Sequence, residues 1–187
     1  MDETMKTLYI SDLDGTLLNP EALLSSSAAE RLNELLAKGL VFSVATARTA
    51  ATAADLVKPL NLSLPIILMN GVAVYDTKTK TYVKEHPMTR ETVQEVFKIL
   101  EKFNTPGFVY SIVDHKLMCY EPPKLNARMA AFMEERKRDY GKVFTPISSY
   151  DATKDKDVIY FTVIDEEKAL AKTYEAVRKR AGVNALF

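Results

Sequence analysis

Short apolar runs and helical stripes alternate along the first half of the chain, in the order that a β–α–β unit requires. Apolar runs at residues 8–11, 40–45 and 65–69 predict three strands. The run at 40–45 is almost continuously apolar, which is typical of a parallel strand covered on both faces. Tyr9 and Ile10 are expected to be buried in the first strand. Parallel pairing with a right-handed crossover follows from this order.

Helical patterns separate these strands. Residues 27–30, Ser-Ala-Ala-Glu, resemble a capping box at the start of a helix. The buried stripe of that helix is predicted to consist of Leu32, Leu35 and Leu36, and Gly39 suits its C-terminal cap. Residues 50–57 predict a second helix, which ends before Pro59. After the third strand, residues 72–85 predict a hairpin.

From residue 86 onward the pattern indicates a separate α+β unit. Thr89 can cap a helix whose apolar stripe is Val93, Val96, Phe97, Leu100 and Phe103. Two strands, 108–113 and 117–120, should form a hairpin with His115 in its turn. Pro122-Pro123 opens another helix, and its inward side chains are predicted to be Leu125, Met129, Phe132 and Met133. A strand at 158–164, a helix at 166–181 capped by Asp165 and Gly182, and the start of a strand at 183–187 complete the prediction.

The composition narrows the classes of protein and of site. The 187 residues contain 25 basic and 25 acidic side chains, a balance that argues against nucleic-acid binding driven by net charge. One cysteine, Cys119, and two histidines, His86 and His115, cannot form a zinc cluster, so a metal site would need oxygen ligands. No apolar stretch is long enough to span a bilayer, and the first residues do not resemble a signal peptide. A cytoplasmic protein is expected.

The candidate chemistry begins where the first strand ends. Asp12 and Asp14 stand two residues apart and run into Gly15, at the edge where open α/β sheets bind ligands. Such close carboxylates repel each other unless a cation lies between them, and Mg²⁺ prefers hard oxygen ligands of this kind. Gly15 can adopt a positive φ and leave backbone amides facing an anion. An ordinary Asp-rich turn is the structural alternative.

Two further segments end at the same predicted edge. The hydroxyl of Thr46 could donate to a phosphate oxygen, although Thr46 or Thr49 could equally be the N-cap of the following helix. Both roles are compatible, because a helix N-terminus is itself an anion site. Asn70-Gly71, after the third predicted strand, is first of all a turn sequence.

These motifs together resemble a known family. Residues 12–17, Asp-Leu-Asp-Gly-Thr-Leu, resemble the first motif of the haloacid dehalogenase (HAD) superfamily of phosphotransferases. Residues 46–48, Thr-Ala-Arg, resemble the second motif of its Cof-type branch, with Ala47 where glycine is usual. Asn70-Gly71 also resembles that branch, in which this pair borders the substrate pocket, so that role and a simple turn are equally open alternatives. The resemblance covers essentially the whole chain. It implies an α/β fold, with a partial doubly wound parallel (Rossmann-like) HAD core at 1–85 and an inserted α+β cap domain at 86–187.

The resemblance implies a phosphatase that uses Mg²⁺ and acts on small phosphomonoesters such as sugar phosphates. In that family pattern Asp12 attacks phosphorus to form an aspartyl-phosphate, and Asp14 is the general acid and base. Both carboxylates are expected to bind the metal. The expected phosphate-binding and substrate-binding residues are Gly15, Thr46, Arg48, Asn70 and Gly71. The partner is then a small phosphorylated metabolite, with no nucleic acid and no membrane.

The family pattern continues with a phosphate-contacting lysine and an acidic motif that completes the metal site. No Gly-Asp-x-x-Asn-Asp-like segment follows residue 100, so we expect an N-terminal portion with weak metal affinity and impaired turnover. A non-catalytic binding module, or a phosphomutase or phosphotransferase, is the alternative function. In the complete family fold the first strand lies mid-sheet. With the later strands absent, residues 8–11 are expected to be a sheet edge with unpaired backbone groups. We expect the chain to self-associate through this edge, or another segment to cover it.

Overall fold

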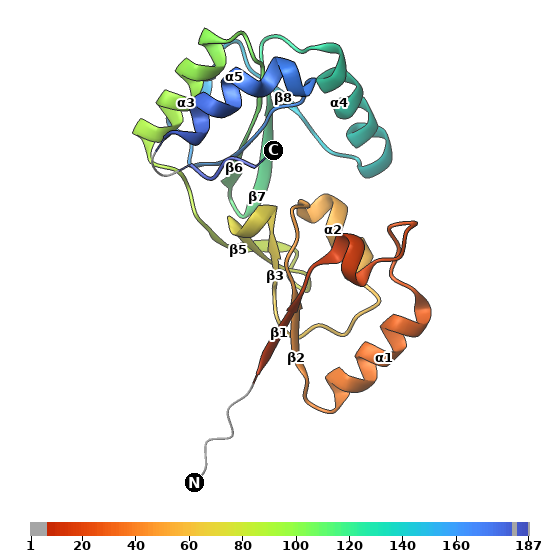
Figure 1. Ribbon diagram of the computed structural model, residues 1–187. Coiled ribbons are helices and arrows are strands. Elements are labelled where there is room, and N and C mark those ends of the chain that lie inside the picture. Colours follow the sequence, from red (N-terminus) through yellow and green to blue (C-terminus); the bar gives the residue numbers. More distant parts are fainter. Residues whose placement is uncertain (1–6, 181–182, 187) are drawn as a thin grey trace. The chain divides into compact units, whose positions relative to one another are not determined.

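The computed structural model describes residues 7–180 and 183–186, and it divides the chain into two compact units. The N-terminal unit is Met1–Glu85 and the C-terminal unit is His86–Phe187. Each has its own strands and helices (Figure 1). None of the helices within the described residues combines the length and the apolar character that a membrane crossing needs.

The N-terminal unit has a β–α–β–α–β order followed by a hairpin. Its elements are β1 (Leu8–Ser11), α1 (Ser26–Ala37), β2 (Val41–Val44), α2 (Ala50–Val57), β3 (Ile66–Leu68), β4 (Ala73–Asp76) and β5 (Thr81–Glu85). β1 pairs in parallel with β2, and an isolated parallel bridge between Ala45 and Ile67 links β2 to β3. β3, β4 and β5 are antiparallel. The predicted parallel unit and hairpin are confirmed, and with them the α/β fold class.

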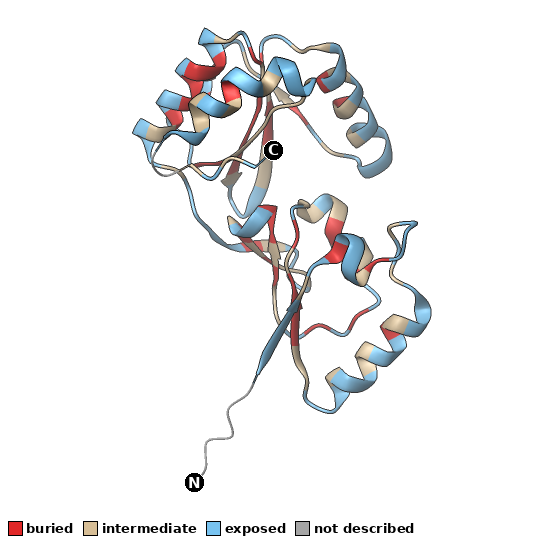
Figure 2. Ribbon diagram, in the orientation of Figure 1, coloured by how far each residue is buried: buried red, intermediate tan, exposed pale blue. Residues whose placement is uncertain are grey.

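β1 is an edge strand in the described part of the sheet. Its only strand partner there is β2, and Figure 2 shows it as exposed. Tyr9 and Ile10 retain 54% and 49% of their accessible surface, so the prediction that they are buried is wrong. In β2, by contrast, Phe42, Ser43 and Val44 are buried. A strand is buried only where neighbouring elements cover it, and the sequence of β1 does not reveal that cover.

Helix α1 begins two residues earlier than the capping-box pattern indicates. The side chain of Ser25 is the N-cap and accepts a hydrogen bond from the amide of Ala28 at 3.3 Å. Ala28, not a glutamate, therefore occupies the third helical position, and the predicted box is wrong. The prediction that Leu32, Leu35 and Leu36 form a buried stripe is also wrong. Leu35 is exposed, and Leu32 and Leu36 are only partly buried.

The C-terminal unit is a four-stranded sheet with three helices. Its elements are α3 (Arg90–Lys102), β6 (Phe108–Val113), β7 (Lys116–Glu121), α4 (Ala127–Tyr140), β8 (Thr145–Pro146), β9 (Val158–Thr162) and α5 (Glu167–Arg178). The strand order is β8-β7-β6-β9. The core beneath α3 consists of buried residues from α3 and the sheet with Tyr150: Val93, Val96, Phe97, Leu100, Val109, Tyr120, Tyr150 and Val158. The predicted α3 stripe is confirmed apart from the half-buried Phe103.

Caps and short elements of this unit differ from the prediction in places. Thr89 caps α3 as expected, by accepting from the amide of Thr92 at 3.2 Å. Asn126, rather than Pro122-Pro123, starts α4. β8 and a helical turn at Tyr150–Thr153 lie between α4 and β9, where no element was predicted. Residues 183–186 form no strand, and the predicted C-terminal cap of α5 at Gly182 lies outside the described residues.

Candidate functional site

Backbone hydrogen bonds join the loops that follow β1, β2 and β3. The amide of Ala45 donates to the carbonyl of Ser11 at 2.8 Å, and the amide of Thr46 donates to the carbonyl of Ile67 at 3.0 Å. The amide of Asn70 in turn donates to the carbonyl of Thr46 at 3.2 Å. These bonds hold the three loops at one end of the N-terminal sheet, as the parallel order predicts.

The loop after β1 is a tight turn that leaves its first carboxylate exposed. The amide of Leu18 donates to the carbonyl of Leu13 at 2.9 Å and closes the turn. Leu13 is fully buried and anchors it, while Gly15 has a φ of 70°. Asp12 Oδ1 accepts from the amide of Leu13 at 2.8 Å. The anchoring role of Leu13 was not predicted, although its apolar character between two aspartates is a signal for it.

Asp14 and Arg48 form a two-point ion pair between the loops after β1 and β2. Arg48 Nε donates to Asp14 Oδ2 at 2.8 Å, and Arg48 Nη2 donates to Asp14 Oδ1 at 2.6 Å. The hydrogen bond and charge of Arg48 lower the pKa of the Asp14 carboxyl below its ordinary value, against a smaller opposing effect of burial. Both oxygens of this carboxylate thus accept from the same guanidinium.

Thr46 lies buried beside this ion pair. Its hydroxyl oxygen accepts from the backbone amide of Arg48 at 3.2 Å, which leaves the hydroxyl hydrogen able to donate to a phosphate oxygen. The N-cap of α2 is Thr49, so that alternative role does not fall to Thr46. The side chain of Thr49 makes no capping bond, and its buried Oγ1 has no hydrogen-bond partner among the described residues.

Asn70-Gly71 forms the turn between β3 and β4, as its sequence predicts. Met69, Asn70 and Gly71 all have positive φ, at 53°, 57° and 95°. The amide of Met69 donates to the carbonyl of Arg48 at 3.1 Å, so the turn is fixed directly to the segment that carries the arginine. Asn70 is exposed. The turn does not exclude the second role, and a place for Asn70 and Gly71 beside the substrate stays a prediction.

Asp12 and Asp14 are the side chains of this site that could bind a metal ion. Asp12 offers a carboxylate at the exposed turn, but both oxygens of Asp14 accept from Arg48. Across residues 7–180 and 183–186, no three side chains of His, Cys, Asp or Glu are grouped closely enough to bind a metal together. Mg²⁺ takes one or two carboxylates and completes its shell with water and phosphate. The single carboxylate of Asp12 is compatible with a Mg²⁺ ligand, but the described residues offer no larger ligand set around it.

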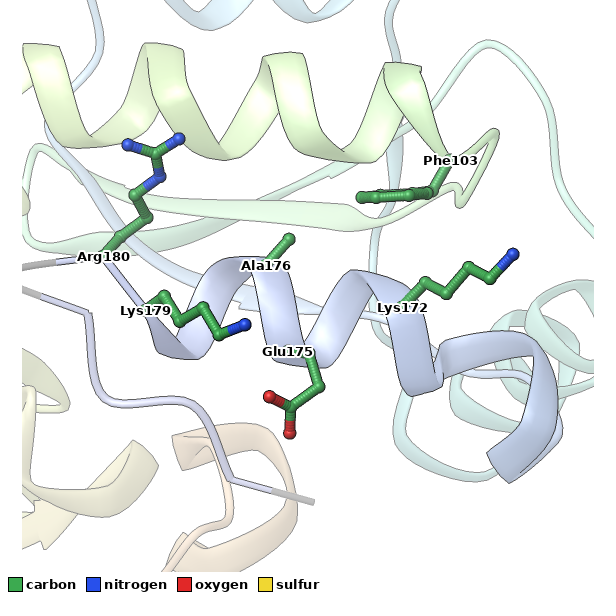
Figure 3. A pocket seen from close by; sticks show the side chains of 6 residues that line it. All are labelled: Phe103, Lys172, Glu175, Ala176, Lys179 and Arg180. Atoms are coloured by element: carbon green, nitrogen blue, oxygen red, sulfur yellow. The ribbon is translucent and has the colours of Figure 1, made fainter.

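The C-terminal unit has a separate hollow between α3 and α5. It measures about 530 Å³ and is lined by Phe103, Lys172, Glu175, Ala176, Lys179 and Arg180 (Figure 3). Arg180 forms an ion pair with Glu95 of α3, with 3.5 Å between Arg180 Nη1 and Glu95 Oε2. None of the predicted site residues lies in this hollow. The catalytic candidates are instead gathered at the strand ends of the N-terminal unit.

The chain belongs to the haloacid dehalogenase-like hydrolases, whose family pattern it matches over residues 9–185. This confirms the resemblance stated from the motifs. Phosphatases of this superfamily generally use Mg²⁺.

Two curated relatives are phosphatases of different substrates. The pyridoxal phosphate phosphatase YbhA of Escherichia coli is 27% identical over 142 residues, which are 76% of this chain and 52% of that protein. The 5-amino-6-(5-phospho-D-ribitylamino)uracil phosphatase YcsE of Bacillus subtilis is 32% identical over 104 residues, or 56% of this chain and 41% of that protein. The chain thus spans about half the length of these relatives.

A solved structure shows the same fold. The HAD subclass IIB sugar phosphatase BT4131 superposes with a TM-score of 0.66 at 23% identity, over 93% of this chain and 64% of that one. The likeness supports the fold class of a HAD core with an α+β cap domain.

Proposed function

We propose that this chain carries the chemistry of a Mg²⁺-dependent phosphatase for small phosphomonoesters, with Asp12 as the nucleophile. The main support is the gathering of Asp12, Asp14, Thr46 and Arg48 at one end of the sheet. Phosphoryl transfer depends mostly on positioning and on electrostatic stabilisation, which carboxylate, hydroxyl and guanidinium groups supply. The named substrates of the relatives differ from one another, but all are phosphorylated small molecules. The proposal therefore covers this whole class, with sugar phosphates included, and names no single substrate.

The steps follow from the chemistry of these side chains. A carboxylate oxygen of Asp12 attacks phosphorus, and the bond from phosphorus to the leaving oxygen breaks. Asp14, released from Arg48 and protonated from solvent, donates its proton to that oxygen. Asp14 then takes a proton from water, and the resulting nucleophile attacks the aspartyl-phosphate to release phosphate and regenerate Asp12. Thr46 and Arg48 hold the phosphate oxygens throughout. Gly15 lets the turn present backbone amides to the same anion.

Bound Mg²⁺ would neutralise charge between the nucleophile and the phosphate. Asp12 and Asp14 are the proposed ligands, Asp14 only while its carboxylate is both ionised and released from Arg48. Because the described residues supply so few ligands, we expect weak metal affinity and slow turnover. A single preorganised stabilising group is already worth about 10²- to 10³-fold in rate.

The two units divide the work in this proposal. The N-terminal unit supplies the chemistry, with Asn70 and Gly71 beside the leaving group. The C-terminal unit is the cap that selects the substrate. The cap role of the C-terminal unit is supported by the family membership and by the division of the chain after Glu85.

Steady-state hydrolysis of p-nitrophenyl phosphate over long incubations tests the proposal. We expect slow release of nitrophenol that depends on Mg²⁺, is abolished in Asp12→Asn, and is unchanged in Asp55→Asn, an exposed aspartate of α2. The amide is nearly isosteric with the carboxylate but is a far weaker nucleophile. Hydrolysis by Asp12→Asn at the wild-type rate would remove Asp12 from the mechanism. Fast hydrolysis that is lost in this variant would instead show that a further residue, with no role in the steps above, completes the site.

A further inference from the structure

The Asp14–Arg48 ion pair uses the donor arrangement that a phosphate monoester needs. The Nε and Nη2 donors of Arg48 contact the two oxygens of Asp14 in parallel, at 2.8 and 2.6 Å. The planar guanidinium fork fits carboxylate and phosphate oxygens in the same two-point manner. A phosphate group bound at these donors would therefore displace Asp14 from them.

The two partners are not held equally. Arg48 Nη1 donates to the carbonyl of Thr52 at 3.4 Å, and the backbone of Arg48 is fixed by Thr46 and Met69. Its side chain keeps 22% of its accessible surface, whereas that of Asp14 keeps 51%. Asp14 also stands in a turn next to Gly15, with extended backbone angles inside that turn. Arg48 is the anchored partner, and Asp14 is the one able to leave.

We propose that Asp14 occupies the anion-binding fork of Arg48 until a phosphate monoester displaces it. This inference rests on the proposed function and extends it: Arg48 is the anion-binding residue, and Asp14 is its internal competitor. Asp14 becomes available to the substrate only when the phosphate has taken over Arg48. Binding of the anion and release of the acid–base group are thus one event at one guanidinium. The buried hydroxyl of Thr46 lies beside the exchange and can bind the same anion.

A double-mutant cycle with inorganic phosphate tests this competition without any turnover. Affinity is measured by isothermal titration calorimetry at fixed pH and ionic strength, with a chelator present, for wild type, Asp14→Asn, Arg48→Met and the double variant. We expect Asp14→Asn to bind phosphate roughly 1.4- to fivefold more tightly, the range that an exposed ion pair of about 0.2–1 kcal/mol allows. In the Arg48→Met background most of that gain should vanish.

The cycle separates competition from simple charge repulsion. Removal of an acidic side chain near an anion helps binding in any background, so the part of the gain that depends on Arg48 is the diagnostic quantity. Asp12→Asn removes an equal charge from the same turn and is the matched control, with a gain expected to be unaffected by Arg48→Met. The Arg48 Nε–H resonance gives an independent readout, because added phosphate should shift it in the wild-type protein.

Equal gains from Asp14→Asn in both backgrounds would overturn the proposal, and so would weaker phosphate binding by Asp14→Asn, since Asp14 would then be orienting Arg48. These outcomes would leave the proposed function standing. Absence of phosphate binding in every variant would overturn both. Asp14 is exposed and asparagine is nearly isosteric with it, so the variant is expected to fold; a circular dichroism melt verifies this.

Discussion

The turn at 12–17 places its functional side chains through a small number of backbone constraints. Leu13 is buried, the amide of Leu18 closes the turn, and Gly15 adopts a φ of 70°. A Cβ added at Gly15 would meet no atom within 4 Å. Glycine is required there for its backbone conformation and not for space.

This requirement makes Gly15 a sharp test of the turn. Gly15→Ala should lower the free energy of unfolding by about 1 kcal/mol, because alanine is disfavoured at positive φ. Gly15→Asn should cost less, since asparagine tolerates this region better than other side chains. Denaturant titrations followed by circular dichroism compare the three proteins. An asparagine variant that is no more stable than the alanine variant would mean that the turn does not hold this conformation.

Strand β1 pairs with another strand on one side only and carries exposed apolar side chains. Leu8, Tyr9 and Ile10 keep 49%, 54% and 49% of their surface, and within the described residues only β2 pairs with the strand. An exposed strand with apolar side chains is a template for pairing with another chain. The edge expected from the family's strand order is confirmed. Self-association through it stays a prediction.

Concentration-dependent self-association should therefore be visible by sedimentation velocity. Tyr9→Lys should shift the population toward monomer, because a charged side chain on an edge strand opposes pairing. Leu35→Lys is the matched control, since it places the same charge on another exposed apolar residue of the N-terminal unit and should not change association. A wild-type chain that stays monomeric at high concentration, with rapid amide exchange along β1, would contradict the prediction.

For the molecule as a whole, local sequence patterns predicted the order of the main helices and strands. β2 and β3 were predictable because both are apolar runs that the fold covers, and α3 because its stripe repeats every three or four residues. The exposure of β1 was not predictable from its residues, since an apolar run does not reveal whether a neighbour covers it. β8 is too short to have a pattern of its own.

The candidate site shows the same limit. The motifs identified Asp12, Asp14, Thr46 and Arg48, and parallel strand order predicted that they lie at one sheet edge. The two-point pairing of Asp14 with Arg48 joins residues 34 positions apart and depends on how two loops pack. Neither the contact with the Thr52 carbonyl nor the positive φ of Met69 has a sequence signal of its own.

The proposed role of Asp12 as the nucleophile is open to direct observation by acid-quenched single-turnover labelling. The chain is mixed with p-nitrophenyl phosphate and Mg²⁺, quenched in acid, digested and analysed by mass spectrometry. We predict one phosphoryl group on the peptide containing Asp12, none in Asp12→Asn, and wild-type labelling in Asp55→Asn. Asp14→Asn should accumulate more label, because nitrophenolate leaves without a proton whereas hydrolysis of the intermediate needs a base. No label on Asp12 in either the wild type or Asp14→Asn would contradict nucleophilic catalysis by this residue.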